Sequence, residues 1–541
     1  MTDDHGANRE DQLGADGGVT GQRAVSPTED GRVVDVLIVG GGAAGAVVAA
    51  RASEQPNLDV VVVEAGPDYA DLDRLPGDLV DGHDNSLVDH DWGLRYHPVS
   101  VEQSVAFPRG RVTGGSSAVN TTIALRGVPA DYDHWAALGN PEWSWSSVLP
   151  AFRRLERDLD YGAEAHHGDA GPITIRRWTV DELVPTQAAF LAAAEALGHP
   201  RCDDVNHPEA SGVGVMAMNK LGRVRISTAV GYLAPARVRD NLTIVPGSTA
   251  VRVLVDDGRA TGVEVAGADG RRSTIRARLV VVATGAVQTP GLLVRSGIGD
   301  PVELAALGID RVASVPGVGA NLSDHPALLV AMTPTAPELV DPALPLVQTI
   351  TRYTTEGSDQ PLDVNIELIT RVPRRYGGRA VGLAASLEWV EGRGRIRQSG
   401  ADPHAKPVIE SGFGRDERDL DRNVAALGDA LALAARPELA ELIDEIVFPD
   451  PYRRSPDQLR ELARRASGSG YHPCGTARMG PADDPGAVVD QYGRCHAIDG
   501  LVVADASIMP TIPRANTNLT SIMIGEMIGE WIRTEPARYG L

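Results

Sequence analysis

The sequence predicts an α/β fold that opens with a βαβ unit and continues into a region of antiparallel strands. Three observations predict it. A β-branched run at Val33–Val39 leads directly into the glycine-rich turn Gly40–Gly45. A second buried-strand pattern, Leu279–Val287, precedes a helical pattern. Between them, Asn241–Val265 alternates apolar and polar residues around turn signals, which is typical of antiparallel strands.

The βαβ unit carries the pattern of a dinucleotide site. Its helix and second strand are predicted at Ala43–Ser53 and Val60–Val63. Gly40, Gly42 and Gly45 satisfy GxGxxG, in which the glycines allow a tight turn, approach to a pyrophosphate and close helix packing. Glu64 follows Gly45 by 19 residues, the position of an acid that binds ribose hydroxyls. A carboxylate there favours FAD or NAD over NADP.

Composition narrows the class of protein. The 541 residues correspond, at about 150 residues per domain, to three or four domains or to two large ones. The 51 Lys and Arg against 73 Asp and Glu give a net charge of −22, which opposes binding to nucleic acid or an anionic membrane. The three cysteines form no CxxC pair, so we expect neither a disulfide framework nor a structural zinc site.

The first 32 residues predict a disordered tail rather than a secretory signal. They are polar, charged and glycine-rich, and they lack an apolar segment. The longest apolar run, Val36–Ala50, is interrupted by glycines and is shorter than the ~20 residues that span a membrane. We therefore expect a cytoplasmic protein without a membrane partner.

Later segments suggest where a ring and a substrate would lie. Arg109–Asn120 is rich in glycine and hydroxyl side chains, which suits a backbone that passes close to a flat ring. Asp505 follows a short strand and would lie at the edge where α/β sheets bind ligands. Residues 334–467 differ in composition and lack phosphate-loop glycines, so they are the candidate substrate region. The remaining elements are predicted as helices and turns at Asp131–Glu156, a long helix at Asp416–Arg436, and a strand at Leu501–Ala504 before a final helix.

Four groups of motifs, in this order, resemble the glucose–methanol–choline (GMC) family of FAD-dependent oxidoreductases. They are GGGAAG with VVEAG; RGRVTGGSSAVN with RGVPADYDHW; GAVQTPGLLVRSGIG with GVGANLSDHP; and YHPCGTARMG with VADASIMPTIPRANTNL. The match extends from Val33 to Ile532 and is most similar to bacterial 5-hydroxymethylfurfural and aryl-alcohol oxidases.

The resemblance implies a two-domain GMC fold. FAD would lie extended across a Rossmann-like domain, and the antiparallel sheet of a discontinuous α+β domain would cover its isoalloxazine ring. We expect the FAD-binding domain at 33–165, 215–330 and 470–541, and the substrate-binding domain at 166–214 and 331–469.

Two residues match the family's catalytic positions. His472 matches the catalytic histidine, and an imidazole suits the removal of an alcohol proton because it titrates near neutrality. Asn516 matches the second position, where an amide can donate to an oxygen that becomes alkoxide-like but cannot act as a base. Proton removal would then fall to His472 alone.

The resemblance also implies the cofactor contacts. Some relatives bind FAD covalently through a histidine at the place of Val119, so here we expect FAD without a covalent bond. Asn518 would bond the pyrimidine edge of the flavin, Val251 the adenine, and Asp505 with Ala506 the ribitol–phosphate region. The expected cofactor-binding residues are Gly40, Gly42, Ala43, Ala44, Gly45, Glu64, Ala65, Gly115, Ser116, Asn120, Val251, Asp505, Ala506 and Asn518.

Other chemically capable residues have simpler interpretations. His134 and His325 are expected to be structural, and Cys474 to be a small buried residue. His166 and His167 lack acidic or cysteine partners at ligand spacing, so no metal is expected. Substrate contacts are expected between Asp363 and Trp389 and near Tyr471, with Asn365 and Glu367 as polar candidates.

The resemblance favours oxidation of a primary alcohol, aryl, furanic or similarly small, to its aldehyde. His472 would take the proton, hydride would pass to flavin N5, and O₂ would be the electron acceptor. The alternatives are a dehydrogenase of choline type or another type that uses a quinone or redox partner, a GMC-fold hydroxynitrile lyase, and a flavin-binding protein without catalysis. No heptad or exposed apolar stripe indicates an oligomeric state.

Overall fold

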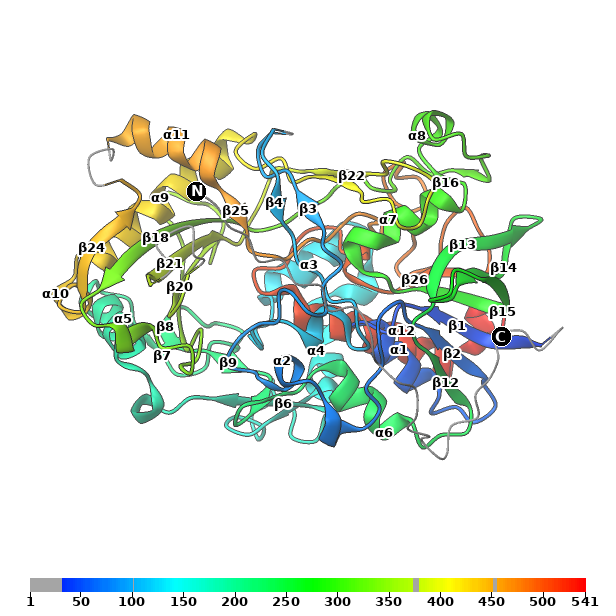
Figure 1. Cartoon of the computed structure of the whole chain (residues 1–541), viewed down its shortest axis with the longest axis horizontal. Coiled ribbons are helices and arrows are strands. Elements are labelled where there is room, and N and C mark those ends of the chain that lie inside the picture. Colours follow the sequence, from blue (N-terminus) through cyan, green and yellow to red (C-terminus); the bar gives the residue numbers. More distant parts are fainter. Residues whose placement is uncertain (1–31, 101, 373–378, 451–454) are drawn as a thin grey trace, which may run out of the picture.

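The computed structural model describes residues 32–100, 102–372, 379–450 and 455–541. The predicted tail at 1–32 therefore lies, except for its last residue, outside the described residues. Two large sheets occupy opposite ends of the long axis, with helices and loops between them (Figure 1). Among these residues, none of the helices has the length and apolar character that crossing a bilayer requires.

The first sheet has the predicted βαβ unit at its centre. Its seven strands run in the order β12-β2-β1-β15-β14-β13, with β26 beside β15. They are β1 (Val33–Val39), β2 (Val60–Val63), β12 (Leu242–Val245), β13 (Thr249–Asp256), β14 (Arg259–Ala266), β15 (Arg272–Val282) and β26 (Leu501–Val503). The strands β12, β2, β1, β15 and β26 are parallel, whereas β13 and β14 form an antiparallel extension. The carboxyl ends of β1 and β15 thus meet at one edge.

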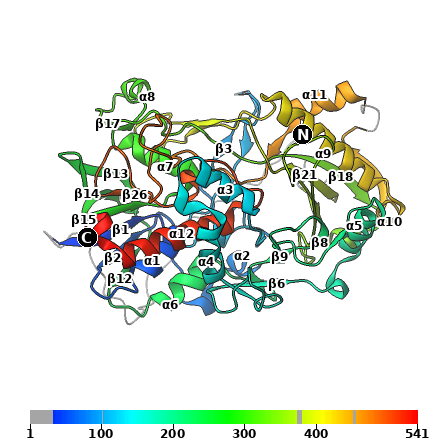
Figure 2. The same ribbon diagram turned by 180° about the vertical axis from the view of Figure 1, so that it is seen from behind.

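Three helices accompany the strands of this sheet. The helix α1 (Gly45–Ala52) follows β1, α7 (Gly285–Arg295) follows β15, and α12 (Thr517–Thr534) packs on α1. The two helices α1 and α12 lie very close, since a Cβ at Gly525 would lie 2.7 Å from the carbonyl oxygen of Ala44. Figure 2 shows α12 running from the first sheet toward the middle of the molecule. Its N-terminus therefore points into the centre.

Two sequence expectations need correction in this sheet. The run from Asn241 was expected to be antiparallel throughout, but β12 pairs in parallel with β2. Alternation of apolar and polar residues does not give the direction of a strand relative to its neighbour, and β12 is the edge strand beside β2. The strand expected to reach Val287 stops at Val282, because Gly285, at φ +80°, turns the chain into α7.

The second sheet is mostly antiparallel and has the strand order β24-β18-β21-β20-β19-β8-β7, with β25 beside β18. Its strands are β7 (Arg201–Cys202), β8 (Gly212–Val215), β18 (Pro326–Pro334), β19 (Thr349–Tyr353), β20 (Val364–Ile369), β21 (Val381–Leu387), β24 (Ile443–Phe448) and β25 (Gly468–Ser469). The helices on its outer side are α5 (Pro185–Ala196), α9 (Glu417–Ala434), α10 (Pro437–Ala440) and α11 (Pro456–Ala466).

Alternation along the strands separates the two faces of this sheet. On β20, Val364, Ile366 and Leu368 pack with α5 and α9 in one apolar core. The intervening Glu367 and Ile369 face the other way and line a cavity. The sheet therefore turns an apolar face to its helices and a partly polar face to the centre of the molecule.

Shorter elements fill the middle and the edges. A three-stranded sheet joins β5 and β6 in parallel and β6 and β9 antiparallel. The elements of this group are α2 (Gly77–Val80), β3 (Arg95–Tyr96), β4 (Val105–Ala106), α3 (Pro129–Ala137), α4 (Trp145–Leu155), β5 (Glu156–Asp158), β6 (Ile173–Arg177), β9 (Ala217–Met218), β10 (Lys220–Leu221), β11 (Val224–Arg225), α6 (Ala234–Ala236), β16 (Ile298–Gly299), α8 (Pro301–Ala306), β17 (Ala313–Ser314), β22 (Arg395–Arg397) and β23 (Val408–Glu410).

The predicted domain ranges stay a prediction. The bounds of the strands in the two large sheets can be compared with those ranges. The strand β18 begins at Pro326, five residues before the range expected for the substrate domain. The strand β6, inside the expected 166–214, joins the small central sheet rather than the large one.

Candidate active site

A cavity of about 440 Å³ lies between the two large sheets. The first end is lined by the glycine turn after β1 and by Gly115 and Ser116, whereas Arg109, at the start of the same segment, lies near His472. The other end is lined by His472 and Asn516 together with the inner face of the second sheet. The cavity therefore brings together residues from all parts of the chain in which site residues were predicted.

The glycines hold two backbone segments in contact at the first end. A Cβ at Gly115 would lie 2.7 Å from Gly42 Cα, which is closer than two non-bonded carbon atoms can approach. The N–H of Gly114 donates to the carbonyl oxygen of Gly41 at 2.7 Å. A Cβ at Gly45 would lie 2.0 Å from the carbonyl oxygen of Gly40, so Gly45 serves helix packing and does not line the cavity. The turn and the Arg109–Asn120 segment thus form one continuous cradle.

Glu64 lies in this cradle, at the end of β2. Its Oε2 accepts from the N–H of Gly41 at 2.9 Å, and its Oε1 accepts from the N–H of Gly66 at 2.8 Å. Burial raises the pKa of Glu64, while these backbone donors oppose the shift. Each oxygen keeps a lone pair for a further donor. Ala65, which follows Glu64, also lines the cavity.

The segment that begins at Arg109 is fixed by its own hydrogen bonds. Ser116 Oγ accepts from the N–H of Gly110 at 3.2 Å, and Asn120 Oδ1 accepts from the N–H of Thr122 at 2.9 Å. Ser116, Val119 and Asn120 all line the cavity. The segment Arg109–Asn120, predicted to pass close to a ring, therefore forms part of the cavity wall.

Two predicted contacts differ in detail. Val251 does not line the cavity; Ala250 does, because adjacent strand residues point to opposite faces, and Val251 is buried with its carbonyl bonded to Arg295 Nε. The Asp505 carboxylate accepts from the N–H of Gly285 at 2.8 Å and from Thr289 Oγ1 at 2.7 Å. This side chain therefore anchors the start of α7, although Asp505 and Ala506 both line the cavity.

His472 and Asn516 form a pair at the second end. Asn516 Nδ2 lies 2.9 Å from His472 Nε2, and His472 Nδ1 lies 3.0 Å from His325 Nδ1. Burial, with the nearby His325 and Arg109 side chains, holds the pKa of His472 well below its usual range. The imidazole is therefore neutral at neutral pH and has one nitrogen free to accept a proton.

The segment around His472 is bonded to the residues that precede β18. Asp324 Oδ1 accepts from the N–H of His472 at 2.9 Å and from the N–H of His325 at 2.9 Å. The backbones of Ser323 and Cys474 exchange two hydrogen bonds of 3.0 and 2.9 Å. Burial raises the pKa of the Asp324 carboxyl to about 6, against the effect of its hydrogen bonds. Asp324 thus fixes the backbone from which both imidazoles project.

A buried ion pair holds the segment that precedes Asn516. Arg514 Nη1 lies 2.6 Å from Asp131 Oδ1, and the Arg514 N–H donates to Asp131 Oδ2 at 2.8 Å. Asp131 belongs to the predicted motif RGVPADYDHW and Arg514 to the motif that contains Asn516. Asn516 is the N-cap residue of α12, and Asn518, in the first turn, lines the cavity with a buried Nδ2 that has no hydrogen-bond partner.

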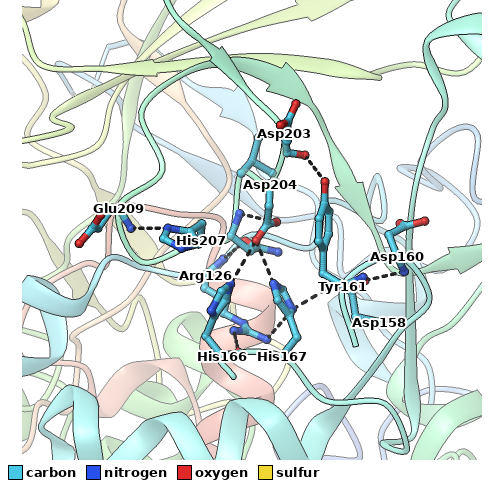
Figure 3. A network of polar contacts seen from close by, with 12 residues as sticks. Arg126, Asp158, Asp160, Tyr161, His166, His167, Asp203, Asp204, His207 and Glu209 are labelled. Atoms are coloured by element: carbon cyan, nitrogen blue, oxygen red, sulfur yellow. Dashed lines mark hydrogen bonds and ion pairs between the residues drawn. The ribbon is translucent and has the colours of Figure 1, made fainter. Parts of the chain in front are cut away.

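It was wrong to treat His166 and His167 as residues without acidic partners. The fold brings Asp158 and Asp204 to this pair (Figure 3), together with Glu156. His167 Nδ1 lies 2.8 Å from Glu156 Oε1, and His167 Nε2 lies 2.9 Å from Asp204 Oδ2. These acids are separated from the histidines in sequence and could not be counted as partners by spacing.

Arginines already neutralise this cluster. Arg126 pairs with Glu156, and Arg177 pairs with Asp158 and Asp204. Burial lowers the pKa of His167, but hydrogen bonds with Asp204 and Glu156 outweigh it and raise that pKa. The carboxylates are therefore matched by guanidinium and imidazolium groups, which is the arrangement of a structural ion network.

The other secondary candidates can now be placed. Cys474 is buried, and burial raises the pKa of its thiol, as expected for a small packed residue. Glu367 lines the cavity, whereas the neighbouring candidate Asn365 does not. His325, expected to be structural, contacts His472 directly. Asp324 and Glu388 were not named individually, although Asp324 stands in the quoted motif GVGANLSDHP and Glu388 lies within the range Asp363–Trp389 in which substrate contacts were predicted.

Comparison with known proteins identifies the family of the chain. The N- and C-terminal models of the GMC oxidoreductases match residues 34–327 and 390–525. The chain is 35% identical to 5-(hydroxymethyl)furfural oxidase of Methylovorus sp. (strain MP688), over 93% of this chain and 99% of that protein. It is 34% identical to oxygen-dependent choline dehydrogenase of Brucella canis, over 93% and 96%. The crystal structure of pyridoxine 4-oxidase from Mesorbium loti is 30% identical, with a TM-score of 0.85 over 92% of this chain and 98% of that one.

Proposed function

Because the chain belongs to the GMC oxidoreductases and is an FAD-dependent alcohol oxidoreductase, we propose that it oxidises a small primary alcohol to the aldehyde. His472 acts as the base and Asn516 as the oxygen-binding partner. The substrate is aryl, furanic or of similar size, and O₂ is the electron acceptor. The observation that carries this proposal is the contact of 2.9 Å between His472 Nε2 and Asn516 Nδ2 inside the cavity.

The residues of the cavity fit FAD. Gly42 and Gly115 line the cavity with bare backbone, and a Cβ at Gly115 would collide with Gly42 Cα at 2.7 Å, so this backbone stays open to a flat ring or a pyrophosphate. The unpartnered Asn518 Nδ2 needs an acceptor, and a ring carbonyl supplies one. Gly42, Ala43, Ala44 and Glu64 would hold the pyrophosphate and ribose. Val119 offers no atom for a covalent link, so FAD is bound without one, and acid precipitation would release it.

The neutral imidazole of His472 sets the chemistry. An alcohol hydroxyl that enters between His472 and Asn516 gives its proton to His472 Nε2. When bound, FAD supplies the acceptor for the hydride that leaves the carbinol carbon, and O₂ then takes the two electrons as hydrogen peroxide. The low pKa of His472 keeps Nε2 unprotonated before the alcohol arrives.

Asn516 and Asp324 fix the positions of the two groups between which the proton moves, the alcohol oxygen and the His472 ring. The Asn516 amide donates to the alcohol oxygen while negative charge develops there. Asp324 holds the His472 backbone, so the ring does not need to reorient during the transfer. Asn516 acts on the alcohol oxygen and Asp324 acts on the base. Neither role depends on the rest of the alcohol molecule.

Anaerobic mixing with benzyl alcohol and with 5-(hydroxymethyl)furfural tests the proposal. The flavin absorbance near its visible maximum should bleach, and admission of air should restore it with one hydrogen peroxide per aldehyde. Restoration by a quinone or dye but not by air would replace the oxidase with a dehydrogenase. Absence of bleaching by a broad panel of primary alcohols would contradict the proposal and leave the lyase reading.

A further inference from the structure

Two carboxyl groups on the second sheet face the catalytic end of the cavity. Glu367 is on β20, and Glu388 directly follows β21, the neighbouring antiparallel strand. Both line the cavity that also contains His472 and Asn516. The sheet therefore presents an acid pair on the wall that the substrate would contact.

Apart from a hydrogen bond between Glu388 and the Ser386 side chain, these acids lack, among the described residues, the hydrogen-bond partners that buried carboxyl groups normally have. Among the described residues, no side chain or backbone group makes a hydrogen bond or ion pair with the Glu367 carboxyl. Glu388 is 3% exposed, and its Oε2 is buried without a hydrogen-bond donor. A buried carboxyl oxygen without a donor is costly, so the wall is incomplete without a ligand.

The basic side chains nearest to Glu388 do not form an ion pair with its carboxyl group. His325 Nδ1 lies 3.5 Å from Glu388 Oε2, but burial lowers the pKa of His325 to about 3, so the ring is neutral. Arg352 acts on Glu388 only at longer range, because its guanidinium donates to the carbonyls of Val205 and Arg514. Burial raises the pKa of Glu367 to about 7, and burial with the charge of Glu367 raises that of Glu388 to about 8.

We propose that Glu367 and Glu388 form a subsite for a protonated primary amine, so that the preferred substrate is a small alcohol that carries an ammonium group. A cation between the two carboxylates would allow both to ionise and would fill the empty acceptor positions. A primary ammonium has three N–H donors for these oxygens. This inference deepens the proposed function and rests on it.

The walls around the pair favour a primary ammonium over a quaternary one. The neighbouring lining residues on these strands are Ile369, Ala384 and Ser386, which are aliphatic or small. Among the described lining residues, the aromatic ones are Trp92 and Tyr471, which lie outside the second sheet. An aromatic cage, the usual site for quaternary ammonium groups, is therefore not built around these acids.

Paired substrates test the inference in the FAD-loaded enzyme at neutral pH. We expect kcat/KM for 3-(aminomethyl)benzyl alcohol to exceed that for its neutral isostere 3-ethylbenzyl alcohol by about 10- to 100-fold, the value of one or two charged hydrogen bonds. The Glu367→Gln and Glu388→Gln variants should each lose most of this ratio, because kcat/KM for the ammonium alcohol falls more than kcat/KM for the neutral isostere. Glu356→Gln, an exposed residue with the same change in charge, should keep the parent ratio.

Binding of benzylamine separates the two proposals, because it carries the amine but no hydroxyl. Titration of the holoenzyme, followed by flavin absorbance, should give a Kd that rises about tenfold or more in either glutamine variant. Unchanged binding and an unchanged substrate ratio would overturn the subsite, even if neutral alcohols are oxidised. Glutamate-dependent binding without bleaching by any alcohol would support the subsite and contradict the proposed oxidation.

Discussion

Asn516 Nδ2 lies 2.9 Å from His472 Nε2, and this contact fixes the tautomer of the imidazole. An amide nitrogen can only donate, so Nε2 accepts and the single proton of the neutral ring is on Nδ1. His472 Nδ1 in turn lies 3.0 Å from His325 Nδ1, which can accept a hydrogen bond from the His472 Nδ1–H. The nitrogen that faces Asn516 is therefore the one that carries the basic lone pair.

Asn516→Ala should lower the rate of anaerobic flavin reduction by about 10²- to 10³-fold, as for the loss of one oxyanion donor. The variant loses both the donor to the alcohol oxygen and the group that holds Nε2 as the acceptor. Stopped-flow absorbance with benzyl alcohol measures the rate. Asn365→Ala, an amide of the substrate region outside the cavity wall, is the matched control, and equal rates in the two variants would contradict the role of Asn516.

The pH dependence of flavin reduction should reflect the low pKa of His472. Only the neutral ring accepts a proton, so activity is lost as pH falls through this pKa, and the loss should begin well below pH 6.5. Arg109→Gln removes a nearby positive charge and should move the acid limb to higher pH. Arg111→Gln, an exposed neighbour, should leave the limb in place. An acid limb that is insensitive to Arg109 would contradict this electrostatic account.

Asp324 should act through the position of His472. Asp324→Ala removes the acceptor for the His472 N–H, and we expect kcat to fall about 10²-fold with little change in KM. Asp324→Asn keeps an acceptor oxygen and should recover part of the rate. Ser469→Ala removes the hydroxyl that donates to Asp324 Oδ2 and accepts from the Tyr471 N–H but leaves the acceptor for the His472 N–H, so it should have a smaller effect. A parallel loss in all three variants, with an equal fall in melting temperature, would indicate a structural role only.

The sequence predicted those parts of the site that lie on continuous motifs. The strands at Val33–Val39 and Val60–Val63, the glycine turn and Glu64 could be read directly because a βαβ unit is built from adjacent residues. His472 and Asn516 were identified through the family motifs, but their contact depends on the folding of distant segments. Glu388 was predicted only as part of the range Asp363–Trp389, and the acids around His167 carried no signal. Alternation predicts which strand residues share a face but not which strands become neighbours.

The cluster around His167 should make stability depend on pH. Its pKa is raised in the folded chain, so its contribution is complete below the unfolded value near 6.5 and is lost as pH rises through the folded value. His167→Gln should therefore lower the melting temperature most in mild acid and least at alkaline pH. His207→Gln, on the edge of the same region, is the matched control (Figure 3). A deficit that grows with pH would contradict the assigned charge state.

The most direct test of the account is the reductive half-reaction of His472→Ala. The purified variant should bind FAD and show the parent's flavin spectrum, because the glycine turn and Glu64, which would hold the pyrophosphate and ribose, are unchanged. Anaerobic mixing with benzyl alcohol should then bleach the flavin about 10²- to 10⁴-fold more slowly than in the parent, as for the loss of a general base. Bleaching at the parent rate would contradict the assignment of His472 as the base.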